Sequence, residues 1–344
     1  MTYETKSRGE EKPKPIRTTF YSKIQIPVFL GKRYRHTSDL LVGLAVRGPC
    51  TTRTAAKYVL ENTPDYEYKP VRDRESSNLA KNYNNLINDK RSSKKHWSGL
   101  LTQKYVVRLD EKTNEKNTKA YAYALTMKGC FVALGYDFTD DQLTSFIKNA
   151  SRNNLYFAYI NRILSQTSIS FVKDIFISSI QRIIKKGRIT LDDEIGFYFN
   201  NIADINGYAL IELLSDVIEK VVTDSQSKNK RFDLMSHPRM GEIEILKKNT
   251  FYAFMNFDDW IDRMTNYFYP NEDEREFRRD YSKGSGDARL LYYVMRAIHH
   301  SYFNAFSMGT PKLTSRLPPN SREWKSHYKD KKHSLMMRKK LIAG

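Results

Sequence analysis

The sequence has little of several features that mark common protein classes. Its 344 residues include only two cysteines, Cys50 and Cys130, too few for a four-cysteine metal site or a disulfide framework. We interpret both as small buried side chains. No apolar run approaches the roughly 18 residues that indicate a membrane span, and the first residues lack the apolar segment of a secretory signal. These absences predict a soluble, intracellular protein without membrane contact.

Motifs for catalysis and cofactor binding are also scarce. No constellation of serine, cysteine or histidine suggests a nucleophile. His299 and His300 are neighbours, and adjacent side chains on a helix point about 100° apart, so the two cannot chelate one metal ion as an i, i+4 pair would. We therefore expect a protein that is not an enzyme and that holds no metal and no cofactor.

Basic residues are abundant but unevenly distributed. The chain has 58 Lys and Arg against 39 Asp and Glu, a net charge of +19. Residues 1–136 carry +13, residues 137–310 carry −2 and residues 311–344 carry +8. We expect the two ends to face a polyanion and the middle not to do so.

The first 36 residues predict a basic extended arm, because prolines interrupt a polar segment. Three charges near its end, on Lys32, Arg33 and Arg35, are suited to phosphate contact. An ordinary solvated loop is the alternative interpretation.

Two short helices are predicted next. Thr37 or Ser38 caps the first, and Thr51 or Thr52 caps the second. Helical spacing places the apolar side chains inward, namely Leu40, Leu41, Leu44, Ala45, Ala55, Ala56, Val59 and Leu60. Arg53 and Lys57 then point outward, where we expect phosphate contacts.

A third helix is predicted from about Glu75 to Asp89. Its inward stripe is Leu79, Tyr83, Leu86 and Ile87. The opposite face carries the residues we expect to read DNA bases: Asn78, Lys81, Asn82 and Asn85. Asparagine can donate to and accept from the edge of adenine at once, and lysine can reach guanine or phosphate. The alternative is that an AT-rich genome scatters asparagine and lysine everywhere.

A two-stranded ribbon follows, from Lys104–Leu109 and Ala120–Leu125, with strict alternation in the second strand. The polar connection between them carries three lysines that we expect to contact phosphates: Lys112, Lys116 and Lys119. Thr126 is then expected to cap a fourth helix.

This segment resembles a known family. The run GLLTQKYVVRL, a polar turn and KAYAYALTMKG are similar to the winged helix-turn-helix transcription regulators common in archaea and bacteria, in which a short strand, a charged wing and a Y-x-L-T-x-x-G return into a helix recur. The similarity covers about 95 residues, and the connection of residues 62–74 is longer than the 3–4-residue turn of the simplest motif. The resemblance implies binding of double-stranded DNA, usually as a dimer.

The remainder of the chain predicts an all-α bundle over residues 140–310, with two helices separated near Asn206 and Gly207. Its apolar stripes predict bundle core, with an apolar ligand pocket or a dimer face as the alternative. A basic tail of residues 311–344 follows. Three interpretations of it are open: a second phosphate-binding arm, a helix that docks on a partner, and an end that only increases solubility.

Together these observations predict a mainly α fold, with a winged helix-turn-helix at residues 37–136 and an all-α dimerisation or effector domain at 140–310. The expected function is sequence-directed binding of double-stranded DNA as a transcription regulator, with a homodimer and a small-molecule effector as further expectations. We expect a cytoplasmic, nucleoid-associated location. The alternatives are a replication-initiation or partition protein of a mobile element, and an assembly component in which the same module binds RNA or protein.

Overall fold

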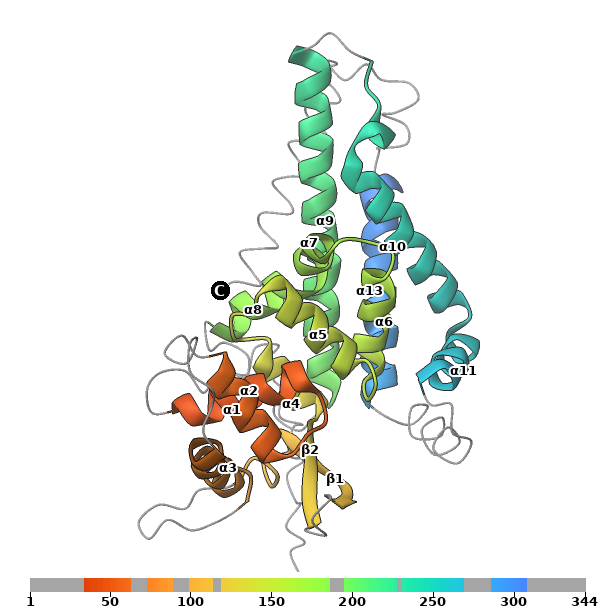
Figure 1. Ribbon diagram of the computed structural model, residues 1–344. Helices are drawn as coiled ribbons and strands as arrows, with labels where there is room; N and C mark the ends of the chain where they lie inside the picture. The colour runs from red at the N-terminus through yellow and green to blue at the C-terminus, as the bar shows by residue number, and fades with distance from the viewer. Residues whose placement is uncertain are drawn as a thin grey trace, which may run out of the picture.

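The computed structural model describes residues 34–62, 73–88, 99–113, 119–185, 195–227, 231–268 and 286–307. It is mainly helical, with one antiparallel sheet of two strands (Figure 1). None of the helices in these ranges is both long and apolar enough to cross a membrane. The predicted basic tail, residues 311–344, and most of the N-terminal arm lie outside the described residues.

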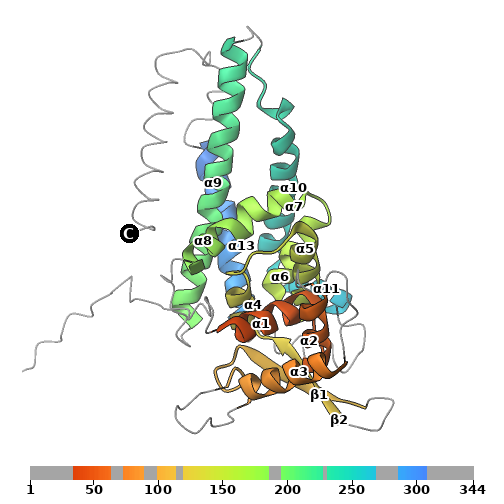
Figure 2. The same ribbon diagram turned by 60° about the vertical axis from the view of Figure 1, so that its left-hand side comes forward.

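The N-terminal part consists of three helices, a β-hairpin and a fourth helix. In order they are α1 (Arg35–Arg47), α2 (Thr52–Glu61), α3 (Asp73–Ile87), β1 (Val106–Thr113), β2 (Lys119–Leu125) and α4 (Met127–Ala133). The element order matches the prediction, although β1 continues four residues beyond the expected Leu109 through a register shift between Leu109 and Glu111. Both views show α3 and the hairpin at the same end of the molecule (Figures 1 and 2).

The predicted start of α1 was wrong. Ser38 does not cap this helix but lies inside its first turn, where its hydroxyl donates to the carbonyl of Arg35 at 2.8 Å. Thr37 is buried, at 2% exposure, so its side chain packs inward. The prediction for α2 is confirmed, because Thr51 Oγ1 accepts a hydrogen bond from the backbone N–H of Thr54.

All regular elements in the described part of residues 140–307 are helical. They are α5 (Asp140–Ala150), α6 (Leu155–Leu164), α7 (Ile169–Val172), the π-helical segment η3 (Lys173–Ile177), α8 (Ser178–Lys185), α9 (Ile195–Ser227), the 3₁₀ turn η4 (Leu234–Ser236), α10 (Pro238–Met255), α11 (Phe257–Phe268) and α13 (Gly286–Ser307). The long helix α9 packs along α13, and α10 packs on the other side of α13 (Figure 1).

The predicted break at Asn206 and Gly207 was wrong, because α9 runs through both residues without interruption. Gly207 instead permits close packing, since a Cβ atom there would lie 2.7 Å from Ser301 Oγ on α13. Asn206 is fully buried and hydrogen-bonded at both ends of its amide. Its Nδ2 donates to the carbonyl of Ile175 in η3, and its Oδ1 accepts from Tyr156. Gly207 and Asn206 therefore hold α9 against neighbouring helices, and they do not end a helix.

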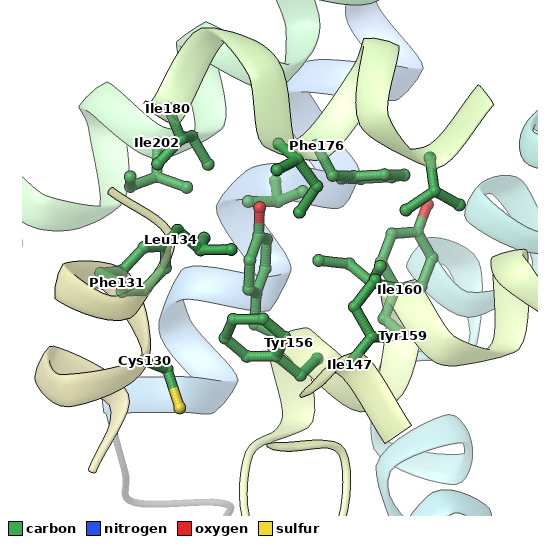
Figure 3. Close-up of a cluster of buried hydrophobic side chains, with 14 of the residues drawn as sticks. Cys130, Phe131, Leu134, Ile147, Tyr156, Tyr159, Ile160, Phe176, Ile180 and Ile202 are labelled. Atoms are coloured by element: carbon green, nitrogen blue, oxygen red, sulfur yellow. The ribbon is translucent and has the colours of Figure 1, made fainter. Parts of the chain in front are cut away.

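The hydrophobic core is continuous between the N-terminal elements and the bundle. Phe131 of α4 lies 5.6 Å from the ring of Tyr156 and 6.1 Å from that of Phe157, both on α6. Figure 3 shows the side chains of α4, α6, η3, α8 and α9 converging there. Cys130 is buried at its edge, as predicted, whereas Cys50, predicted to be buried as well, is only half-buried. The division of the chain near residue 136 into two domains stays a prediction.

Candidate nucleic-acid interface

The outward face of α3 is a polar stripe. Asn78, Lys81, Asn82 and Asn85 are all exposed and follow the i, i+3, i+4, i+7 spacing of one helix face. On the opposite face Tyr83 and Ile87 are fully buried. The predicted orientation of this helix is therefore confirmed, whereas base reading by these residues stays a prediction.

Arg74 extends the stripe by one turn and was missed by the sequence analysis. The helix begins at Asp73, two residues before the expected Glu75, and Arg74 is exposed four residues before Asn78. From Arg74 to Asn85 the stripe is about 16 Å long at 1.5 Å per residue. We call these five residues, Arg74, Asn78, Lys81, Asn82 and Asn85, the α3 stripe.

Helix α2 fixes the position of α3. The hydroxyl of Thr52, in the first turn of α2, donates to Oδ1 of Asn84 at 3.3 Å. Asn84 therefore helps to position α3 against α2. Arg53 and Lys57 follow on the exposed side of α2. Lys57 lies 3.7 Å from Glu61, and exposed ion pairs of this kind contribute only about 0–1 kcal/mol, so Lys57 can exchange this partner for a phosphate.

A backbone bridge attaches the hairpin to the helices. Cys50, between α1 and α2, exchanges two hydrogen bonds with Tyr123 of β2: its N–H donates to the Tyr123 carbonyl at 3.1 Å, and its carbonyl accepts at 2.9 Å. The Tyr123 hydroxyl is hydrogen-bonded to Asn88 at the end of α3, while burial raises the pKa of this hydroxyl. Cys50 thus has a backbone role that its residue type did not indicate.

Two glycines allow the hairpin to sit close to its neighbours. A Cβ on Gly129, in the first turn of α4, would lie 2.0 Å from the carbonyl oxygen of Tyr105, and one on Gly99 would lie 2.4 Å from that of Ile87. Thr126 caps α4 as predicted, accepting from the N–H of Gly129 and donating to the carbonyl of Lys104 at 2.6 Å. The L-T-M-K-G run therefore fixes the base of the hairpin.

The hairpin presents a cation on its exposed surface. Arg108 of β1 is exposed and lies over the ring of Tyr121 on β2, 4.4 Å from the centroid, where a cation is attracted by the face of the ring. The sequence analysis missed Arg108, although it lies in the predicted strand. Lys112 pairs with Ala120 and Lys119 with Thr113 in the ladder.

The remaining predicted phosphate contacts are only partly visible. Arg35 is exposed at the start of α1, 3.9 Å from Asp39. Lys116, Lys32 and Arg33 lie outside the described residues, as do the side chains of Lys112 and Lys119. The structure therefore joins α3 to α2 and to the hairpin by hydrogen bonds, and it leaves the α3 stripe, Arg53, Lys57 and Arg108 exposed.

Elsewhere, the described residues hold no group of three or more His, Cys, Asp or Glu side chains suited to a metal ion. The rings of His299 and His300 are nearly perpendicular, 5.8 Å apart. Comparison of the chain with protein-family models, curated proteins and solved structures finds no match.

Proposed function

We propose that this chain binds double-stranded DNA in a sequence-directed way, through α3 and the β1–β2 hairpin, as a winged helix-turn-helix transcription regulator does. The observation that carries the proposal is the α3 stripe. Five side chains able to donate hydrogen bonds to base edges or phosphates lie in one exposed row, on a helix whose other side is fully packed.

The dimensions and chemistry of α3 suit a major groove. An α-helix with its side chains is about 10–12 Å across, and the major groove of B-DNA is about 12 Å wide. Asn78, Asn82 and Asn85 offer the bidentate pairing that suits adenine, and Arg74 and Lys81 can reach guanine or phosphate. The stripe thus combines base-reading and charge-neutralising groups.

The surrounding cations would supply affinity that does not depend on sequence. Arg53, Lys57 and Arg108 are exposed on α2 and the hairpin, which are bonded to α3 near its C-terminal end, and the hairpin lysines follow Arg108 along the chain. Each phosphate neutralised releases counterions, which makes binding weaken as salt rises. We assign these residues to phosphate contacts and the α3 stripe to bases.

The test is a comparison of nucleic acids by fluorescence anisotropy across a salt series. We expect the chain to bind a labelled duplex more tightly than a single strand or an RNA hairpin of equal length. For duplex DNA, log Kd should rise with log salt at roughly 0.9 per phosphate contact. Tighter binding to structured RNA than to duplex DNA would overturn the proposal and support an RNA-binding module.

A further inference from the structure

Aromatic side chains of α10, α13 and the start of α11 form a continuous strip. Ring centroids lie 5.4 Å apart for Phe257 and Tyr292, 5.5 Å for Tyr292 and Phe254, 5.2 Å for Phe254 and His299, and 4.6 Å for His299 and Phe303. Phe251 stacks on His299 at 5.7 Å. We call these six residues, Phe251, Phe254, Phe257, Tyr292, His299 and Phe303, the aromatic strip.

Much of this strip faces outward. Phe251 and Phe303 are each 46% exposed, Tyr292 is 37% exposed, and Met255, one turn beyond Phe251, is 62% exposed. With aromatic side chains of about 150–250 Å² each, these four residues leave roughly 400 Å² of apolar surface in contact with water. An apolar patch of about that size is typical of the largest exposed patch on a monomeric protein, and such patches are often interaction sites.

The surface along the strip leaves little room for a small molecule. The concavity beside Phe251, His299 and Phe303 has room for about one water molecule. A pocket for an effector encloses most of its ligand and needs a volume of several hundred Å³. A helical face from another protein chain fits this surface better.

Charges along the strip are arranged for a second copy of the same chain. The helices α10 and α13 run antiparallel, because Tyr302 bonds Glu244 at one end and Phe254 contacts Tyr292 near the other. Lys248 is exposed at the Phe303 end, and Asp258 and Asp259 are exposed at the Phe257 end. A two-fold rotation about the middle of the strip therefore places the lysine of each copy opposite the aspartates of the other.

We propose that a second copy of this chain docks on the aromatic strip, strip against strip, with Lys248 facing Asp258 and Asp259 across a two-fold axis. About 400 Å² of apolar surface per copy would form the centre of an interface of standard size, which buries about 800 Å² per partner. This proposal goes beyond DNA binding and does not rest on it. The dimer would carry two α3 stripes, away from its interface.

The first experiment measures the dimer dissociation constant of the full chain by sedimentation velocity over a concentration series. Phe251→Glu and Phe303→Glu should each raise it about tenfold or more, since each buries a carboxylate in the centre of the interface. Met235→Glu is the matched control, because Met235 is 61% exposed on η4, outside the strip, and it should leave the constant unchanged. Circular dichroism confirms that each variant is folded.

The second experiment exchanges the charges at exposed positions, where a substitution disturbs folding little. Lys248→Asp alone, and Asp258→Lys with Asp259→Lys, should each raise the dissociation constant about fivefold, and the combined variant should return to within about twofold of the natural chain. A chain that stays monomeric throughout the series, or a dimer insensitive to both sets of variants, would overturn the proposal. So would a truncated chain lacking residues 311–344 that dimerises only once the tail is removed, because the tail would then be the occupant of the strip.

Discussion

At the scale of single residues, the proposed DNA contact depends on side chains of α3 that face away from the hydrophobic core. The 3.6-residue period of Leu79, Tyr83 and Ile87 was enough to predict which side of the helix is exposed. It could not predict that Asn84 accepts a hydrogen bond from Thr52, because the two residues are 32 positions apart in the sequence. Asn82, with its exposed amide, therefore tests base reading better than Asn84.

Replacing Asn82 with Ala should lower specificity more than general affinity. If the amide reads a base, the ratio of specific to non-specific affinity falls by an amount equivalent to about 1–3 kcal/mol. Competition binding on a selected duplex and on random duplex DNA measures both constants. An equal loss on the two DNAs would show that Asn82 contacts the backbone instead.

His299 should make stability depend on pH in a defined direction. Burial among aromatic rings, and secondarily the charge of His300, lower its pKa below the ordinary 6.5, and its Nδ1 is buried without a hydrogen-bond partner in the described part of the chain. Between the folded pKa and 6.5 the unfolded chain binds the proton and the folded chain does not. The free energy of unfolding is therefore highest above pH 6.5 and decreases as the pH falls through that value.

The variant His299→Phe keeps the ring and removes this titration, so urea unfolding should show a smaller decrease between pH 7 and pH 5 than the natural chain shows. His237, whose pKa is also lowered, titrates in both proteins and cancels in the comparison. Identical pH profiles for the two proteins would contradict the assignment to His299.

At the scale of elements, short-range sequence patterns predicted which segments form helices and strands and in what order. They did not predict which of these elements contact one another. Alternation in AYAYAL predicted β2, and Thr126 predicted the start of α4, because both signals lie within a few residues. The bridge from Cys50 to Tyr123 and the close approach of Gly207 to α13 depend on residues 73 and 94 positions apart in sequence, respectively. Gly207 resembled a helix end because glycine has the same local signature at a break and at a close contact.

Gly129 should be essential to the base of the hairpin. In Gly129→Ala the new Cβ would meet the carbonyl oxygen of Tyr105 at 2.0 Å, so we expect a loss of about 1–3 kcal/mol in the free energy of unfolding. Gly241→Ala is the control: this glycine lies exposed in α10 with nothing within 4 Å of the added atom, and the change should stabilise by up to about 1 kcal/mol. Urea unfolding of the two variants gives the comparison, and equal effects would contradict it.

The hairpin lysines should act without regard to sequence. Charge reversal by Lys112→Glu with Lys116→Glu should weaken binding to every duplex and reduce the dependence of log Kd on log salt by roughly 0.9 for each lost phosphate contact. Anisotropy titrations at several salt concentrations measure this slope. An unchanged slope would place these lysines away from the DNA.

At the scale of the whole molecule, one hydrophobic core connects the end that carries α3 and the hairpin to the bundle. Asn149 near the end of α5 lies beside α1, and its amide donates to the carbonyl of Val46 at 2.6 Å. The charge distribution of the sequence predicts that this end faces a polyanion, since +13 of the net charge lies in residues 1–136, and this stays a prediction. It could not predict this joint, which rests on residues 103 positions apart.

The most direct test of DNA binding through α3 compares two triple variants on a duplex selected by the natural chain from a random pool. Lys81→Ala, Asn82→Ala and Asn85→Ala together remove one charge and two amides from the α3 stripe. Lys220→Ala, Thr223→Ala and Gln226→Ala remove one charge and two polar groups from an exposed face of α9. We predict that the α3 variant binds the selected duplex about 100-fold or more weakly, as expected for losing contacts of about 1–3 kcal/mol each, and that the α9 variant binds as the natural chain does. Equal affinities for the two variants would contradict the account.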